Sequence, residues 1–273
     1  MIATDIDYNI LPQAKGSCVD SLNLKDVQKI LLINPNSTKL MTINCIKMIE
    51  QHIPPDSIIY GYTAPSTAPT TVEGHLDGVI SSADVMRDAY NLIKDADACL
   101  VACFSEHPLI NCIREEFDMP VCGIMEAAMY TAKLIGGRFG VITTVYRSQI
   151  RHEDGVKNYG ISNGCAGLLS TGLKVAELHT KPREEVLEIM KSVATTLVLE
   201  KQADTLLLGC AGMTDMKMAV EEAVEPYGVI VIDGVISGVN ILSGILRSGL
   251  KTSKRGLFCS SLESRLSRGQ DWL

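Results

Sequence analysis

The stretch Asp204-Thr-Leu-Leu-Leu-Gly-Cys210 repeats a design that occurs earlier in the chain as Asp97-Ala-Cys-Leu-Val-Ala-Cys103. Each copy consists of an aspartate, a short apolar run and a cysteine six residues after the aspartate. A short apolar run bounded by turn residues is typical of a strand buried on both faces. The repeat therefore predicts two equivalent buried strands, each ending in a cysteine.

The spacing outside these two strands agrees as well. An acidic residue follows the next apolar run 23 residues after Cys103 and again 23 residues after Cys210. Upstream, the strand ends at Asn34 and Thr143 precede the two cysteines by 69 and 67 residues. The alternative is that all doubly wound sheets look alike at this level of detail. Three aligned landmarks in each half nevertheless favour two similar lobes.

Apolar runs alternate with helical patterns along the chain. We predict strands at 29–33, 57–62, 98–102, 121–124, 138–143, 205–208 and 229–232. We predict helices at 37–51, 77–93, 108–117, 126–135, 147–159, 182–201, 214–225 and 234–250. Strands separated by helices of this length are typical of βαβ units and parallel sheets.

We therefore expect an α/β fold of two Rossmann-like lobes with mainly parallel sheets. Pseudo-two-fold symmetry would relate the lobes, and the active site would lie in the cleft between them. We expect a flexible N-terminal extension at 1–28 and a first lobe at 29–137. A second lobe follows at 138–250, whose last helix could pack on the first lobe, and then a C-terminal tail at 251–273.

The composition excludes several classes of function. The 273 residues are 46% hydrophobic and 21% charged, which is typical of a folded globular protein. A net charge of −7 and an aromatic content of 5% argue against nucleic acid or an anionic membrane as a partner. No apolar stretch has the length of a membrane span, and residues 1–28 do not resemble a targeting signal. We expect a cytoplasmic protein with a small-molecule substrate.

The nine cysteines point to a reducing compartment. Their number is odd, none forms a CxxC pair, and none has zinc-finger spacing to a histidine. We therefore expect neither a disulfide scaffold nor a bound metal. The sequence also lacks GxGxxG and GxxxxGK[ST], the glycine-rich motifs that bind dinucleotides and nucleoside triphosphates.

The positions of Cys103 and Cys210 suggest proton chemistry. Ligands of open α/β sheets bind at the carboxyl ends of strands, where both cysteines are expected. A helix N-terminus after each could lower the pKa of the thiol from about 8.5 towards neutrality. Inverting a stereocentre beside a carbonyl needs a base on one face and an acid on the other, which a thiolate and an opposed thiol could supply. Backbone N–H groups past each cysteine could hold the carbonyl oxygen as it gains negative charge.

The segment Leu32-Ile33-Asn34-Pro35-Asn36-Ser37 resembles the opening motif of the Asp/Glu/hydantoin racemase superfamily, in its hydantoin and allantoin racemase branch. The resemblance is collinear from about residue 29 to 256, through Glu73-Gly-His-Leu-Asp77, Ala102-Cys-Phe104, Glu126-Ala-Ala128, Val141-Ile-Thr-Thr144, Leu208-Gly-Cys-Ala-Gly-Met213, Asp233-Gly-Val235 and Thr252-Ser-Lys254. Bacterial members of the branch usually have Gly-Asp-Pro-Gly after the first Cys-Phe. This chain has Ser105-Glu-His-Pro108, which resembles fungal-type relatives.

The resemblance implies a racemase that needs no cofactor and no metal, with Cys103 and Cys210 as its acid/base pair. It also implies substrate contacts from Asn36, Phe104, Gly209 and Ala211, and Thr143 and Thr144 are placed to line the same site. The substrate would be a hydantoin substituted at C5, with allantoin equally credible. The family leaves room for a homo-oligomer, for which the sequence shows no interface.

Other interpretations stay open at this stage. One is a racemase of free acidic amino acids, although their Cα proton is much less acidic than that at C5 of a hydantoin. Another is a ligand-binding relative without activity, against which the two matched cysteines count. A third is a cysteine hydrolase with Cys103 and His107, but Pro108 favours His107 as a helix cap. For Glu126 and Asp233 we expect helix capping rather than proton transfer.

Overall fold

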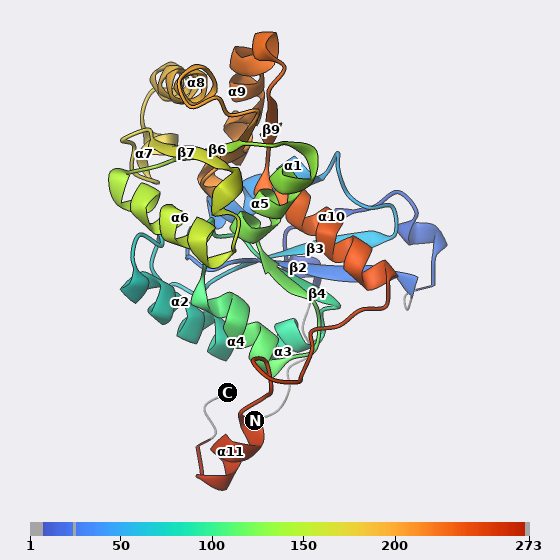
Figure 1. Ribbon diagram of the computed structural model, residues 1–273. Helices are drawn as coiled ribbons and strands as arrows, with labels where there is room; N and C mark the ends of the chain where they lie inside the picture. Colours follow the sequence, from blue (N-terminus) through green and yellow to red (C-terminus); the bar gives the residue numbers. More distant parts are fainter. Residues whose placement is uncertain (1–7, 24–25, 271–273) are drawn as a thin grey trace. The chain divides into compact units, whose positions relative to one another are not determined.

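Two sheets organise the described part of the chain, residues 8–23 and 26–270 of a computed structural model (Figure 1). The first sheet has the order β1-β3-β2-β4-β5 and contains β1 (Gln13–Lys15), β2 (Gln28–Asn34), β3 (Ser57–Thr63), β4 (Ala98–Val101) and β5 (Val121–Gly123). The second has the order β7-β6-β8-β9 and contains β6 (Phe139–Thr143), β7 (Cys165–Ser170), β8 (Thr205–Leu208) and β9 (Ile230–Ile232).

The two sheets share one strand order. Counted from β3, the first sheet reads β3-β2-β4-β5, and the second reads β7-β6-β8-β9, so that each strand of the first sheet except β1 has a counterpart. Strand β2 pairs in parallel with β3 and β4, and β6 pairs in parallel with β7 and β8. The predicted α/β class with mainly parallel sheets is therefore confirmed.

The aspartates of the repeat have the same role in both halves. The backbone N–H of Lys29 donates to Asp97 Oδ2 over 2.7 Å. In the second half, the N–H groups of Gly137 and Arg138 donate to the Asp204 carboxylate over 2.7 and 3.0 Å. Asp97, which precedes β4, thus holds the start of β2, and Asp204, which precedes β8, holds the start of β6. A charged acceptor makes these backbone hydrogen bonds stronger.

We expect Asp204→Ala to lower the apparent free energy of unfolding by about 2 kcal/mol and Asp97→Ala by about 1 kcal/mol. Asp204 accepts from two backbone N–H groups, whereas Asp97 accepts from one. Urea unfolding followed by circular dichroism measures both variants. Equal losses in the two variants would contradict this account of the repeat.

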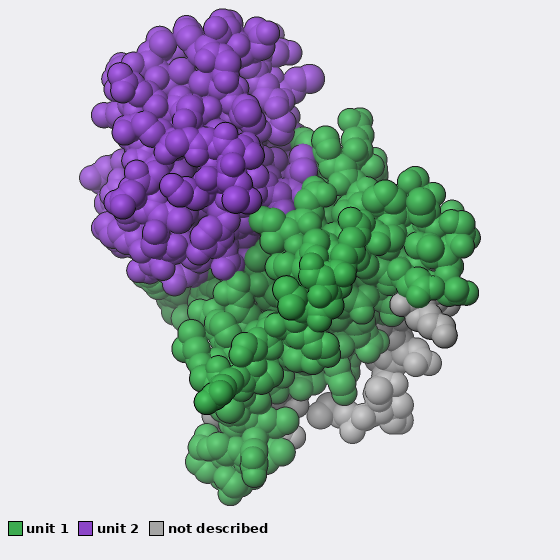
Figure 2. Space-filling model, turned by 45° about the vertical axis from the view of Figure 1, so that its right-hand side comes forward, with its two compact units in different colours: residues 1–102, 107–122, 239–273 green, residues 103–106, 123–238 purple. Residues whose placement is uncertain are grey.

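The first compact unit consists of residues 1–102, 107–122 and 239–273 (Figure 2). Figure 1 shows α2, α3 and α4 grouped beside one another, whereas α1 packs on β3. The unit's helical elements are η1 (Tyr8–Ile10), η2 (Val19–Ser21), α1 (Lys39–Ile49), α2 (His75–Asp88), α3 (Tyr90–Lys94), α4 (Pro108–Glu116), α11 (Leu262–Ser267) and most of α10 (Gly234–Arg247). The predicted helix 77–93 is therefore two helices, α2 and α3, which meet at Ala89.

The second unit consists of residues 103–106 and 123–238 (Figure 2). Helix α8 packs on β6 and β7, and α5 packs on β8 and β9. Its helical elements are α5 (Ile124–Ile135), α6 (Tyr146–Asn158), η4 (Ser162–Gly164), α7 (Glu177–Thr180), α8 (Arg183–Leu199), η5 (Ala211–Met216), α9 (Lys217–Val224), η6 (Glu225–Tyr227) and the start of α10. No helix within the described ranges is long and apolar enough to cross a membrane.

The N-terminal segment differs from the expected flexible extension. Residues 13–15 form β1, which pairs antiparallel with β3, and Val19 and Val27 are buried against Ile58. The sequence pattern of β1 is too weak to predict a strand, because β1 has only three residues and only Ala14 among them is buried. Residues 1–7 and 24–25, which also fall within the expected extension, lie outside the described residues.

The unit boundaries also differ from the expected limits of 137 and 138 between the lobes. Helix α5 falls in the second unit, because it packs on that unit's own sheet. A Cβ on Gly234, at the start of α10, would lie 2.3 Å from the Ile124 carbonyl oxygen at the start of α5, so only glycine fits there. From Val239 onward α10 belongs to the first unit, where Ser243 Oγ donates to Gln28 Oε1 over 2.7 Å.

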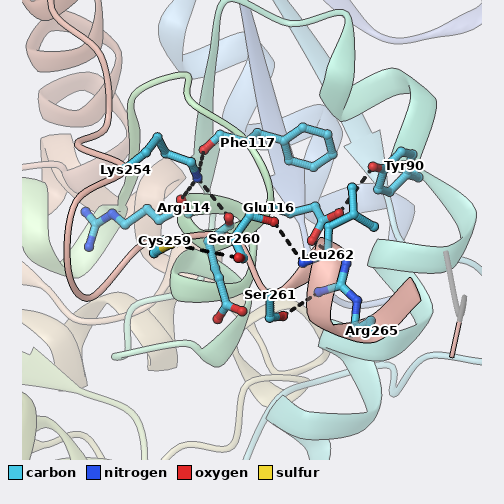
Figure 3. A network of polar contacts seen from close by, with 11 residues as sticks. Tyr90, Arg114, Glu116, Phe117, Lys254, Cys259, Ser260, Ser261, Leu262 and Arg265 are labelled. Carbon is cyan, nitrogen blue, oxygen red and sulfur yellow. Dashed lines mark hydrogen bonds and ion pairs between the residues drawn. The ribbon is translucent and has the colours of Figure 1, made fainter. Parts of the chain in front are cut away.

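The C-terminal tail is anchored to the end of α4 (Figure 3). Lys254 Nζ donates to the carbonyl oxygens of Arg114, Glu115 and Phe117 over 2.8–2.9 Å. These carbonyls lie where a helix leaves acceptors without intrahelical partners, so the lysine acts as a C-terminal cap. Further along the tail, Arg265 forms an ion pair with Glu116 over 2.7 Å. The tail is thus part of the first unit.

Candidate active site

Cys103 and Cys210 both fall in the second unit and lie close enough to interact electrostatically. Cys103 follows β4 and Cys210 follows β8, which are counterparts in the two sheets. Both side chains are partly buried. The negative charge of a Cys103 thiolate raises the pKa of Cys210, which makes simultaneous ionisation of both thiols unfavourable. The pair therefore disfavours the state in which both sulfurs are thiolates.

Each sulfur has a hydrogen-bond partner two residues further along the chain. Cys103 Sγ lies 3.2 Å from the hydroxyl oxygen of Ser105. Cys210 Sγ accepts from the backbone N–H of Gly212 over 3.3 Å. The second contact arises because Cys210 is the N-cap of η5, whose first N–H groups have no intrahelical acceptor. The positions of the partners match, but their chemistry differs.

Burial controls the acidity of both thiols. It raises the pKa of Cys103, although the Ser105 hydroxyl and the Arg151 guanidinium act in the opposite direction. It raises the pKa of Cys210 to about 12, and the Gly212 N–H offsets this only in part. The expectation that helix N-termini lower both pKa values is therefore wrong. Helix α4 begins only at Pro108, and loss of hydration outweighs the Gly212 N–H at Cys210.

Phe104 and His152 pack together beside Cys103. The Phe104 side chain is buried, and its ring meets the His152 ring edge-on with centroids 5.2 Å apart. Burial lowers the pKa of His152 to about 3, so the imidazole is neutral at physiological pH, and it hydrogen-bonds the Phe104 backbone. Its Nδ1 is buried without a hydrogen-bond partner. The sequence analysis did not identify His152 and Arg151, because no pattern in the sequence of α6 shows that this helix lies near Cys103.

The other predicted residues of the second unit line the ends of β6 and β8. Thr143 and Thr144 are buried. The Thr143 hydroxyl donates to the Leu169 carbonyl oxygen over 3.4 Å, and the Thr144 hydroxyl donates to Ser148 Oγ over 3.0 Å. Ala211, next to Cys210, is buried too. These contacts hold the strand ends in place.

Gly209 allows the chain to pass close to β6 just before Cys210. A Cβ at this position would lie 2.4 Å from the Ile142 carbonyl oxygen, closer than any side chain can approach. The Gly209 N–H donates to that same oxygen over 2.8 Å. The glycine therefore determines how close to β6 the backbone lies just before Cys210.

Asn36 lies in the first unit, in the connection between β2 and α1. Its Oδ1 accepts from the Thr38 N–H over 2.9 Å and from Asn34 Nδ2 over 3.2 Å. The side chain is 7% exposed. These bonds give Asn36 a structural role in shaping its own loop, whatever else the residue contacts.

The capping residues behave as the sequence predicts. His107 is the N-cap of α4, where its Nδ1 accepts from the Leu109 N–H over 3.2 Å, and its Nε2 lies 3.1 Å from Ser81 Oγ. With both ring nitrogens engaged in this way, His107 is poorly suited to serve as the base of a cysteine hydrolase. Asp233 accepts from the N–H groups of Val235 and Ile236 at the start of α10.

The sequence is similar to known proteins over most of its length. A family model described as Asp/Glu/hydantoin racemase matches residues 30–242. An uncharacterised protein of Schizosaccharomyces pombe is 40% identical over 84% of this chain and 97% of its own length. A hydantoin racemase of Pseudomonas sp. (strain NS671) is 32% identical over 83% of this chain and 89% of its own length.

The fold is similar to that of a solved racemase structure. An allantoin racemase from Klebsiella pneumoniae superposes with a TM-score of 0.77 at 28% sequence identity. The match covers 85% of this chain and 93% of that protein. Sequence and fold therefore point to the same group of proteins.

Proposed function

Because the chain belongs to the Asp/Glu/hydantoin racemase family, and is thus an isomerase, we propose that it inverts C5 of 5-substituted hydantoins, with allantoin among them. The observation that carries this proposal is the coupled pair of cysteines at equivalent strand ends of the two sheets. Each has a hydrogen-bonding partner two residues later. Such a pair is suited to a reaction that needs one base and one acid of the same chemical kind.

The proposed reaction moves one proton at each face of C5. One cysteine, as the thiolate, takes the C5 proton and becomes a thiol, and the electron pair of the broken C–H bond spreads onto the neighbouring carbonyl oxygen. The other cysteine, as the thiol, then donates its proton to the opposite face and becomes the thiolate. The roles are exchanged for the other enantiomer, so both directions use the same two groups.

The hydantoin ring suits a weak base such as a thiolate. Its C5 is flanked by a carbonyl and a ring nitrogen, so the anion formed there is delocalised. A backbone N–H past either cysteine could hold the oxygen that gains charge, a contact that accelerates such steps strongly in other enzymes. This chemistry asks for no cofactor. Relatives named hydantoin racemase and allantoin racemase support the choice of substrate.

The residues beside the two cysteines complete the proposed site. Phe104, Gly209 and Ala211 flank the sulfurs and would contact the ring, with Thr143 and Thr144 at the end of β6. The partner is a small molecule. Because both thiols must stay reduced, we place the protein in the cytoplasm, where thiols persist.

Optical rotation tests the substrate directly. Enantiopure allantoin and an enantiopure 5-alkylhydantoin are incubated with the protein, and loss of rotation is followed against a blank without enzyme. We expect the rotation to decay to zero with at least one of these hydantoins. Decay only with free aspartate or glutamate would move the substrate to amino acids, and decay with none of them would leave a ligand-binding protein.

The raised thiol pKa values predict how the rate depends on pH. Since one cysteine must be a thiolate and both pKa values lie above the usual range, only a small fraction of the protein is active at neutral pH. We expect kcat/KM, corrected for uncatalysed racemisation, to rise about tenfold per pH unit between about pH 7 and 9. A flat or falling profile over this range would show that neither thiol limits the reaction.

A further inference from the structure

The two sulfurs differ in what their hydrogen-bond partners can do. The partner of Cys210 is the backbone N–H of Gly212, which can only donate. The partner of Cys103 is the hydroxyl of Ser105, which is 5% exposed and lies 3.2 Å from the sulfur. A hydroxyl is both donor and acceptor, and its hydrogen rotates to suit the neighbouring atom. The hydroxyl can therefore follow a change in the protonation of Cys103.

We propose that Ser105 is a positioning residue that keeps Cys103 Sγ hydrogen-bonded in both of its protonation states. The hydroxyl donates to the sulfur when Cys103 is a thiolate and accepts from the S–H when Cys103 is a thiol. This inference rests on the proposed function, because only an acid/base cysteine must alternate between the two forms. It assigns a role to a residue that sequence reasoning left aside.

The location of Ser105 supports this role. The residue sits two positions after Cys103, and its own N–H donates to the Cys103 carbonyl oxygen over 2.9 Å, which closes a tight turn around the thiol. Ser105 is buried, and its hydroxyl has Cys103 Sγ as its hydrogen-bond partner.

Other charged or titratable groups also act near Cys103. They are the Arg151 guanidinium of α6, which favours the thiolate, and the Cys210 thiol, which is coupled to Cys103. His152 is neutral at physiological pH. Glu106 accepts a hydrogen bond from Asn158 Nδ2 over 2.6 Å. None of these groups changes in a Ser105 variant, so the serine can be tested alone.

Thiol alkylation measures the Ser105 contact without relying on racemisation. The pH profile of iodoacetamide labelling at Cys103 is recorded by mass spectrometry of its peptide, with the peptide of the exposed Cys112 as an internal control. Since the hydroxyl stabilises the thiolate, we expect Ser105→Ala to move the Cys103 midpoint up by about one pH unit. Ser105→Thr, which keeps a hydroxyl, should restore the wild-type midpoint. An unchanged Cys103 midpoint in Ser105→Ala would overturn the proposal.

Racemisation kinetics give the second measurement. We expect kcat in Ser105→Ala to fall about tenfold in both directions, because Cys103 loses its partner as base and as acid, and to recover in Ser105→Thr. Loss of kcat in both variants alike would indicate a packing effect and contradict the role of the hydroxyl. If the wild-type protein racemised no hydantoin, the proposed function would fail, whereas the alkylation profile would still test the contact.

Discussion

Replacing either Cys103 or Cys210 with serine should lower kcat for hydantoin racemisation at least about a thousandfold. A serine hydroxyl occupies nearly the same space as the thiol, but its pKa is far too high for it to act as a base or to hold charge near neutral pH. Because each turnover needs one proton acceptor and one proton donor, loss of either sulfur blocks both directions. Racemisation is measured by polarimetry with each enantiomer as the starting substrate.

The two single variants should also differ in what remains. A variant that keeps one thiol can still remove the proton on that face. Over a long incubation the hydrogen of that thiol is replaced from solvent before it is returned, so the variant should slowly exchange C5 hydrogen of one enantiomer with solvent without inverting it. Cys103→Ser and Cys210→Ser are expected to retain this activity for opposite enantiomers. Cys112→Ser, at an exposed cysteine on α4, is the matched control and should keep full activity. Full racemase activity in either site variant would exclude the two-thiol mechanism.

Arg265→Met should lower the apparent free energy of unfolding by about 3 kcal/mol, the largest effect on stability that we expect. The ion pair between Arg265 and Glu116 is nearly buried, with side chains that are 12% and 5% exposed. Methionine fills similar space but leaves the largely buried Glu116 carboxylate without its counter-charge. Tyr90 OH, at 3.3 Å from Glu116 Oε1, offers only one neutral donor in compensation.

An exposed ion pair of the same tail provides the control. Lys251 pairs with Asp118 over 2.6 Å, but these side chains are 69% and 55% exposed. Lys251→Met should therefore change stability by less than about 1 kcal/mol. The double variant Glu116→Gln/Arg265→Met should recover much of the loss, since no buried charge remains. Equal losses in Arg265→Met and Lys251→Met, measured by urea unfolding, would show that burial does not set the strength of these contacts.

The sequence carried enough information to predict the strand framework. The matched Asp-to-Cys segments identified β4 and β8 as counterparts, and the strand order of the two sheets bears this out. Long apolar runs without interruption, such as that of β2, leave little ambiguity because such strands are buried on both faces. The same pattern located both cysteines at strand ends.

Strand β7 escaped prediction for an identifiable physical reason. Its six residues include Gly167, which adopts a φ of +157°, and Leu168 is the one buried residue of the strand. The pairing with β6 is also irregular between Phe139 and Gly140. An edge strand of this kind is stabilised by its pairing with β6, and its own sequence has no hydrophobic pattern that predicts it.

The surroundings of the thiols could not be read from the sequence. The acidity of Cys103 depends on burial and on Arg151, which lies 48 residues away along the chain. The division into units was equally hidden, because four residues around Cys103 join the second unit while the flanking segments belong to the first. Such properties depend on packing between distant segments, which neither periodicity nor spacing encodes.

Deuterium incorporation tests the two-thiol mechanism most directly. One enantiomer of a 5-alkylhydantoin is incubated with the wild-type protein in deuterium oxide, and both enantiomers are separated and analysed early, long before equilibrium. With one thiol on each face, the inverted product should carry deuterium at C5 while the recovered substrate keeps its hydrogen. Deuterium appearing at the same rate in product and recovered substrate would mean that a single base serves both faces, and would contradict the assignment of Cys103 and Cys210 as a pair.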